Sequence, residues 1–461
     1  MNGSEKKISH RGGLLLAALM LFPAACNRSA DASLPAPGAR RPAETAPPSG
    51  AKRGLSAAAE VGRKIFFDKT LSASGAMSCA TCHDPDHAYA PGNDLSVQRG
   101  GPDGHAAGLR AVPSLRYKEY TPRYADLLDN PDGISAPGPG GGFAWDGRAN
   151  TLADQARLPL LSPVEMANAS PAVVVAKLAR APYAPQLAGA FPGVAWTDVD
   201  AAFGAALRAL EAFQREDPSF HPYTSKYDLY ADNKLGGALT PAELRGFKIF
   251  TSAKRGNCSS CHFHGAGLNG SSAIFTDYSY EAIGVPRNAA LPANQDPAAY
   301  DLGLCGPLRA DHAGAGAARN TFCGLFKTPT LRNVATRKAF FHNGVMHSLE
   351  QAVRFYATRD TMPELWYPTV GGRAKAHGDR AFPSYGLVNA QYVGGKVEKY
   401  DDLPARYAAN IDPQLPLDGR ARGSKPPLSE RDIQDLVCFL ETLTDGYQPP
   451  ASPPKAGRCV D

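Results

Sequence analysis

The sequence has little net charge, no long apolar run and few strand signals, and these absences exclude several classes of protein. Its net charge is only +5 over 461 residues, and no basic run alternates with aromatic residues as in a nucleic-acid-binding surface. The apolar run at residues 14–22 is too short to span a bilayer as a stable helix, and strand signals are few and short. A content of 43% apolar and 20% charged residues is ordinary for a soluble globular protein. Because strand signals are few and such basic runs are lacking, we expect this protein to be mainly helical and to have no nucleic-acid partner.

The first 26 residues predict an export signal. Three basic residues precede the apolar run, which ends with small residues before Cys26. This pattern is typical of a bacterial lipoprotein signal peptide over residues 1–26, with Cys26 as the lipidated residue; ordinary cleavage after Ala25 is the alternative. Residues 27–55 are rich in proline and alanine and predict a flexible tether. Contact with the membrane is therefore expected only through an N-terminal lipid anchor.

Two C-x-x-C-H motifs dominate the rest of the chain. In each, two thiols can add to the vinyl groups of a haem while the adjacent histidine reaches the iron. A redox cysteine pair or half a zinc site is the alternative, but no thioredoxin-like pattern surrounds either copy, and one histidine after each pair is poor zinc spacing. The sequence predicts two covalently bound haem c groups and, with the export signal, a periplasmic protein. The haem-binding residues are Cys79, Cys82 and His83 in the first motif and Cys258, Cys261 and His262 in the second.

Four cysteines remain after Cys26 and the four haem-linking thiols are set aside. An even remainder in an oxidising compartment favours two disulfides. We favour the sequence-local pairs Cys305–Cys323 and Cys438–Cys459 over the two other connectivities. Four free buried cysteines are the alternative.

A similar sequence unit precedes each haem motif. Ala57–Phe67 comes before the first motif and Pro241–Phe250 before the second, where Thr240 and Glu243 form a capping box. A class I cytochrome c domain begins in this way, with a short helix that is followed by a C-x-x-C-H motif and then by a long loop. Two further helices are expected, Thr197–Phe213 with Thr197 and Asp200 at its cap, and Ser429–Leu443 with Ser429 and Asp432 at its cap.

The expected fold is mainly α and loop-rich, with two class I cytochrome c-like domains that each carry one covalent haem c. The first domain is expected over residues 56–225 and the second over 226–445, followed by a C-terminal tail at 446–461. The regions 84–142 and 263–325 are rich in glycine and proline, so we expect loops that wrap the haem edges.

Two further stretches resemble a known family. Ala144–Met166 is similar to the central signature of the bacterial di-haem cytochrome c peroxidases and the related MauG proteins, and Phe326–Val334 followed by Phe341–Gly344 is similar to their second signature. With both haem motifs in order, the resemblance covers about residues 56–445. It implies a periplasmic peroxidase that reduces hydrogen peroxide at the N-terminal haem, while the C-terminal haem shares or relays oxidising equivalents.

The resemblance also implies roles for four residues of the central signature. Positions matching Gln155, Pro159 and Glu165 line the distal side of the N-terminal haem, and the position matching Trp145 lies between the two porphyrins. From the residues themselves, Thr151 starts a helix that the interior Pro159 is expected to break, which presents Glu165 to a cavity. A carboxyl group in an apolar pocket can move a proton between the two oxygens of a peroxide. The alternatives are a surface carboxylate and a plain core aromatic residue.

The sixth ligand of the second haem departs from ordinary peroxidases of this family, which have a methionine fourteen residues after the histidine of the second signature. Counting from His342 reaches Tyr356, as in MauG. Ser348 and Gln351 predict a capping box for a helix that turns Tyr356 inward. Core packing of Tyr356 and ligation by Met346 are the alternatives. A phenolate ligand is expected to lower the potential of this haem.

Other positions qualify the resemblance. The family's calcium ligands are matched here by Ala111, Arg337 and Ala339, so we expect that calcium site to be absent. MauG has a surface tryptophan before its second haem motif as an exit for oxidising equivalents, whereas Thr251–Asn257 contains none. This absence weakens the first alternative function, MauG-like oxidation of a partner protein. The second alternative is a di-haem electron-transfer cytochrome c without peroxidase activity.

His87 and His105 follow the first haem motif, where some family members place a histidine that blocks the iron. Neither spacing matches well, so we expect solvent-facing histidines and an open, five-coordinate N-terminal haem. The expected partners are hydrogen peroxide and a small periplasmic electron donor, a cytochrome c or a cupredoxin, or else a protein substrate. The chain does not identify the donor.

Overall fold

A computed structural model describes residues 54–266, 271–309, 311, 317–371, 373–374, 392–393, 395–451 and 456–460. The expected signal peptide with Cys26, and the tether up to residue 53, lie outside the described residues. The α-helices are α1 Ala57–Phe67, α2 Cys79–Cys82, α3 Leu152–Leu161, α4 Pro171–Leu178, α5 Ala184–Ala190, α6 Val199–Glu216, α7 Lys226–Ala231, α8 Pro241–Thr251, α9 Leu349–Thr358 and α10 Glu430–Glu441. No helix within these ranges is long and apolar enough to cross a membrane.

Strands are short and occur in antiparallel pairs. The pairs are β1 Arg99–Gly100 with β2 Ala106–Ala107, β3 Ala125–Leu128 with β4 Gly138–Gly140, β5 Tyr280–Glu281 with β6 Phe326–Lys327, β7 Thr369–Val370 with β10 Lys396–Val397, and β8 Arg373–Ala374 with β9 Tyr392–Val393. Long loops join these elements. The expectation of a mainly helical, loop-rich fold is therefore confirmed.

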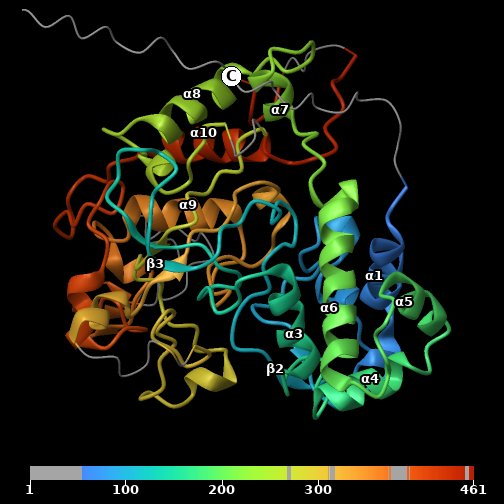
Figure 1. Cartoon of the computed structure of the whole chain (residues 1–461). Helices are drawn as coiled ribbons and strands as arrows, with labels where there is room; N and C mark the ends of the chain where they lie inside the picture. The colour runs from blue at the N-terminus through green and yellow to red at the C-terminus, as the bar shows by residue number, and fades with distance from the viewer. Residues whose placement is uncertain are drawn as a thin grey trace, which may run out of the picture. The chain divides into compact units, whose positions relative to one another are not determined.

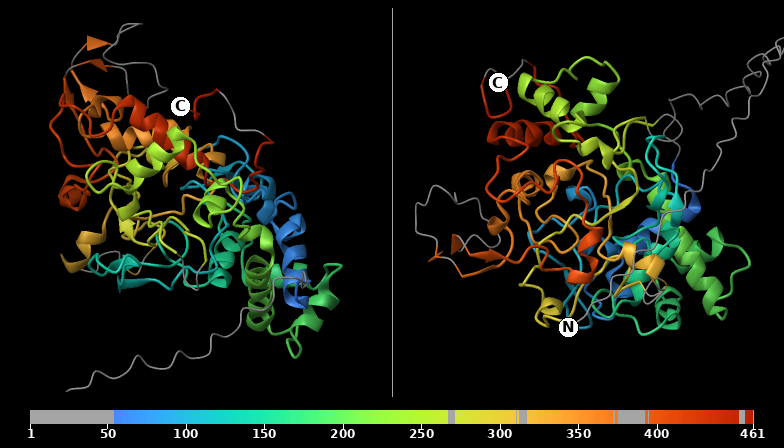
Figure 2. Two further views of the ribbon diagram at one scale, coloured as in Figure 1. Left: turned by 90° about the horizontal axis from the view of Figure 1, so that it is seen from above. Right: turned by 90° about the vertical axis from the view of Figure 1, so that its left-hand side faces the viewer.

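The repeated sequence unit forms the same helix contact twice. Helix α1 packs on α6 and α8 packs on α10, and Figures 1 and 2 show both pairs side by side. A Cβ atom at Gly62 of α1 would lie 1.9 Å from the carbonyl oxygen of Ala209, and one at Gly246 of α8 would lie 1.9 Å from the carbonyl oxygen of Asp435. Both contacts therefore require a residue without a side chain.

Each helix pair has a hydrophobic core of its own. The first core is built from α1, α4 and α6 with loop residues such as Met77 and Phe220, and the second from α8, α9 and α10 with loop residues such as Phe275 and Trp366. In the first core, Phe66 makes edge-on ring contacts with Phe213 and Phe220. The two cores fall on either side of residue 225 in the sequence.

Four helices can be compared with the sequence expectations. Helix α8 begins at Pro241 with the expected capping box of Thr240 and Glu243, and it ends one residue later than expected, at Thr251. Helix α1 has the expected bounds, and α10 begins with the expected capping box of Ser429 and Asp432. The expected cap of the helix at 197–213 is wrong: α6 begins at Val199, and the Asp198 side chain accepts the Ala201 N–H at 3.0 Å. Two acidic residues follow Thr197 closely, so the pattern allowed a cap one residue too early.

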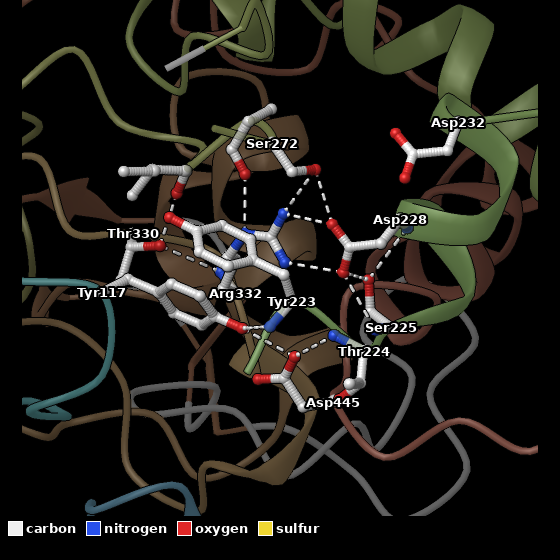
Figure 3. Close-up of polar contacts among 12 residues, drawn as sticks. Tyr117, Tyr223, Thr224, Ser225, Asp228, Asp232, Ser272, Thr330, Arg332 and Asp445 are labelled. Atoms are coloured by element: carbon white, nitrogen blue, oxygen red, sulfur yellow. Dashed lines mark hydrogen bonds and ion pairs between the residues drawn. The ribbon is translucent and has the colours of Figure 1, made fainter. Parts of the chain in front are cut away.

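A polar network joins segments from both halves of the chain (Figure 3). The Arg332 guanidinium is paired with Asp228 at 2.6 Å and lies 4.7 Å from the ring centroids of both Tyr117 and Tyr223. The Tyr117 hydroxyl donates to Asp445 at 2.6 Å. These contacts fix the loop after the first haem motif against residues that flank the second.

Replacing Gly62 or Gly246 with alanine is predicted to destabilise the protein. Overpacking costs about 1–3 kcal/mol, which exceeds the gain of about 1 kcal/mol from alanine in a helix interior. Denaturant unfolding of the haem-loaded protein should show a lower midpoint. Gly189→Ala is the control, because Gly189 lies in α5 with no atom within 4 Å of its added Cβ. Equal midpoints for Gly62→Ala and Gly189→Ala would contradict the close contact.

Candidate active site

The two motif histidines are held in the same way. In the first motif, α2 is followed by His83, whose Nδ1 lies 3.0 Å from the carbonyl oxygen of Tyr89. In the second, His262 Nδ1 lies 3.2 Å from the carbonyl oxygen of Phe275. A carbonyl can only accept, so each Nδ1 carries the proton and each Nε2 is left free for a metal. Burial lowers the pKa of both histidines to about 4, which keeps the imidazoles neutral as ligands must be.

The four motif cysteines are free thiols, whereas the other four described cysteines form two disulfides. Cys305 is bonded to Cys323, and Cys438 to Cys459, the same pairs that the sequence favours. Two free thiols therefore stand beside each histidine. This donor set fits a covalently attached haem c at each motif.

One large cavity joins the second motif to the loop after the first. Cys258, Cys261, His262 and Tyr356 line it together with Trp145. Its apolar walls come from side chains of the second core and from the two signature segments: Phe250, Val285, Leu331, Phe340, Leu428, Leu436 and Leu440. A cavity with this lining, closed by a histidine and a tyrosine, fits a haem.

Tyr356 is half-buried between buried residues of α9, because its side chain lines the cavity. Its hydroxyl has no hydrogen-bond partner in the part of the chain that the structure describes. Burial raises the pKa of Tyr356 above its usual range, and the neighbouring Cys261 and Cys258 raise it further. Met346, the alternative ligand, is fully buried in the second core and is not part of the cavity lining.

The expected capping box before Tyr356 is only half formed. Ser348 accepts the Gln351 N–H at 3.1 Å, but the Gln351 side chain accepts the main-chain N–H of His347 at 2.8 Å instead of that of Ser348. The Ser348 cap alone starts α9 at Leu349. The inward placement of Tyr356 does not depend on the second bond.

The expected break at Pro159 is wrong. Helix α3 continues through Pro159 to Leu161, because a proline near the end of a helix removes only one hydrogen bond, the one to the Gln155 carbonyl. A turn follows, in which the Glu165 N–H donates to the Ser162 carbonyl at 3.1 Å. Gln155 and Glu165 are both half-buried.

Glu165 lies beside the first haem motif. The pKa of the Cys82 thiol is raised to about 11, mainly by burial and in addition by the nearby charge of Glu165. Burial also raises the pKa of Glu165 itself, against the opposing effects of Arg148 and the Ser162 hydroxyl. A carboxyl group whose pKa is raised by burial is suited to accept and return a proton.

Trp145 is fixed by contacts from both halves of the chain. Its Nε1 donates to the Ala111 carbonyl at 2.7 Å, and its own carbonyl accepts the Lys327 N–H at 2.9 Å. The adjacent Asp146 is fully buried and pairs with Arg110 at 2.8 Å.

Arg110 extends this network to the second half of the chain through a bidentate pair with Asp301, at 2.6 and 2.7 Å. Sequence reasoning missed Arg110, Asp146 and Asp301 as a unit. Asp146 and Arg148 in the central signature gave a partial signal, but nothing in the spacing points to Asp301, 191 residues from Arg110.

The positions that match calcium ligands in the family hold a different set of contacts. The Arg337 guanidinium donates to the carbonyls of Val112 at 3.1 Å and Ala339 at 3.3 Å. The N–H of Ala111 donates to the His342 carbonyl at 2.7 Å. A cationic side chain therefore binds the carbonyl oxygens of this region.

The two loop histidines lie as surface residues do. His87 is partly exposed, and its Nδ1 lies 2.8 Å from the Asp84 carboxylate. His105 is exposed, and its main-chain N–H donates to Asp103 at 2.9 Å. Neither histidine lines the cavity that contains Trp145.

Comparisons with known proteins agree with this geometry. The family model for di-haem cytochrome c peroxidase matches residues 56–235. The methylamine utilization protein MauG of Paracoccus denitrificans is 35% identical over 405 residues, which cover 85% of this chain and 90% of that protein. The cytochrome c551 peroxidase of Nitrosomonas europaea is 31% identical over 298 residues, 64% of this chain and 71% of that protein. The crystal structure of the diheme peroxidase BthA of Burkholderia thailandensis matches with a TM-score of 0.71 and 36% identity, covering 86% and 88% of the two chains.

Proposed function

The chain belongs to the di-haem cytochrome c peroxidase family, which includes MauG, and on this premise we propose that it reduces hydrogen peroxide in the periplasm at the haem held by His83. The protein is a peroxidase-type oxidoreductase. The proposed peroxidatic domain spans residues 56–225, and the domain at 226–445 holds a second haem c through His262. The observation that carries this proposal is the pair of equivalent histidines, with the carboxyl of Glu165, whose pKa burial raises, beside the first.

When bound, a haem c supplies the iron that binds peroxide and exchanges electrons with it. The residues of the chain supply the proton chemistry and the orientation. The carbonyl of Tyr89 holds His83 with Nε2 toward the metal. The Glu165 carboxyl can accept the proton of one peroxide oxygen and deliver it to the other, and Gln155 and Pro159 complete the proposed distal wall. Two further protons and two electrons, from a periplasmic cytochrome c or cupredoxin, balance the reduction of one peroxide to two waters.

Tyr356 is the proposed sixth ligand of the second haem. The support is its place in the cavity opposite the second motif, its hydroxyl without a partner among the described residues, and the burial of Met346 elsewhere. A phenolate stabilises ferric iron. The second haem would therefore share oxidising equivalents with the first, and Trp145 is the proposed connection.

Oxidation of a partner protein is a second candidate function. It is favoured by Tyr356 and by 35% identity to MauG over most of the chain. It is weakened by the lack of a tryptophan in Thr251–Asn257. A pure electron carrier is disfavoured, because it has no use for a buried carboxyl group such as that of Glu165. Attachment to the membrane through a lipid on Cys26, with residues 27–55 as the tether, completes the proposal.

Glu165→Gln is predicted to slow peroxide-dependent oxidation of an electron donor by about 10²-fold, because the amide cannot transfer the proton. Both haems should remain attached, as judged by haem stain and the pyridine haemochrome spectrum. Asp154→Asn is the matched control, because Asp154 is an exposed carboxylate on α3. Turnover of Glu165→Gln equal to that of the control would exclude Glu165 as the acid–base group.

Tyr356→Met is predicted to raise the reduction potential of the second haem markedly, because a neutral thioether replaces an anionic oxygen. The variant should then need prereduction before it turns over peroxide. Spectroelectrochemical titration measures the potential, and Tyr356→Phe, which removes only the oxygen, tests ligation separately. A wild-type potential in both variants would make Met346 the candidate ligand.

A further inference from the structure

Three basic side chains line the cavity that contains Trp145 and His262. They are Lys118, in the loop after the first haem motif, and Lys327 and Arg337, in and after the second signature. Burial lowers the pKa of Lys118 to about 8 and that of Arg337 to about 10, and it lowers the pKa of Lys327 well below its usual value. Arg337 and Lys327 also repel Lys118 electrostatically.

None of the three forms an ion pair with a carboxylate in the described ranges. Lys327 Nζ donates to the Gly142 carbonyl, and Arg337 donates to two main-chain carbonyls. Lys118 Nζ has no hydrogen-bond partner among the described residues. The carboxylates that act electrostatically on these lysines are Glu119, which raises the pKa of Lys118, and Asp277, which raises the pKa of Lys327.

Both of these carboxylates are engaged elsewhere. Glu119 accepts the Tyr223 hydroxyl at 3.1 Å. Asp277 accepts Asn130 Nδ2 at 3.0 Å and the Ser279 N–H at 2.9 Å. Neither Glu119 nor Asp277 is therefore an ion-pair partner of Lys118 or Lys327.

Other buried cations of the described chain are treated differently. Arg332 lines the same cavity, yet it is paired with Asp228 and hydrogen-bonded to Ser272, as Figure 3 shows. Five other arginines that are buried in the described residues each have a carboxylate partner: Arg110, Arg309, Arg332, Arg354 and Arg359. Leaving a buried charge unpaired is energetically unfavourable. The unpaired trio is therefore a local feature that needs an anionic partner.

The chemistry of a covalently bound haem supplies that partner. The thioether bonds form at the vinyl edge of the porphyrin, and the two propionate carboxylates lie on the opposite edge. A haem attached through Cys258 and Cys261 would carry its propionates on the edge that faces away from these two residues. Lys118 also influences the first haem site. The pKa of the His83 imidazole is lowered mainly by burial, and the charges of Arg337 and Lys118 lower it further.

We propose that Lys118, Lys327 and Arg337 form a cationic receptor for the haem propionates at the junction between the two haem sites. This inference rests on the proposed function, because it requires both haems. The receptor neutralises carboxylates that would otherwise lie unpaired beside apolar walls. Its positive charge also favours the reduced iron, so it sets the potentials between which electrons pass.

Charge removal in the haem-loaded protein tests the receptor. Lys118→Met and Lys327→Met keep the length of the side chain and remove the charge. Each is expected to lower the equilibrium constant for reduction of at least one haem about tenfold, which is about 59 mV for a one-electron couple. Lys118→Arg, which keeps the charge, should restore the wild-type potential. Lys338→Met is the control, because Lys338 is exposed and donates to the Gly92 carbonyl.

Wild-type potentials in both methionine variants would overturn the proposal. So would potentials of the wild type that depend on phosphate concentration, because a free anion would then occupy the receptor. A wild-type protein without covalent haem in the pyridine haemochrome spectrum would instead overturn the proposed function, which is a different result.

A measurement on the wild type keeps the test independent of variant folding. Redox-difference infrared spectra of protein with ¹³C-labelled propionates should show bands of ionised carboxylates and none of the protonated acid at pH 7. A band of the labelled carboxylic acid would contradict a receptor of three cations.

Discussion

The hydrogen bond from each motif histidine to a main-chain carbonyl is the contact on which the other features of the site depend. It fixes the imidazole tautomer and leaves Nε2 for the metal, once through Tyr89 and once through Phe275. The carbonyls are held in place by ring contacts: Tyr89 packs on Phe66 of α1, and Phe275 packs on Phe250 of α8. Gly62 and Gly246 let α1 approach α6 and α8 approach α10 closely. A short stretch of sequence repeated twice thus builds two equivalent ligand sites.

The asymmetry between the sites comes from residues outside the repeat. Beside the first motif stands Glu165, whose burial raises its pKa, and opposite the second motif stands Tyr356. Trp145 lines the cavity that contains the second motif, and hydrogen bonds to the main chain of Ala111 and Lys327 fix it. On the proposed function, the same histidine site serves peroxide chemistry in one half and the sharing of oxidising equivalents in the other.

Residues close in sequence were predictable, and contacts across the chain were not. The haem motifs, α1, α8 and α10 follow from local spacing and capping, because each signal lies within one or two helical turns. The effect of Pro159 was misjudged, because the number of helix hydrogen bonds that a proline disrupts depends on its distance from the helix end. The N-cap of α6 was placed one residue too early. The pair of Arg110 with Asp301 and the trio of Lys118, Lys327 and Arg337 join loops more than 190 residues apart. No periodicity in a single sequence reports such contacts.

The account predicts two haems in different states in the resting oxidised protein. Electron paramagnetic resonance of the diferric wild type tests this most directly. One high-spin, five-coordinate signal from the haem held by His83 and one low-spin, six-coordinate signal from the haem held by His262 and Tyr356 are expected in equal amounts. Two low-spin, six-coordinate haems with no high-spin component would contradict an open peroxidatic site, and with it the proposed function.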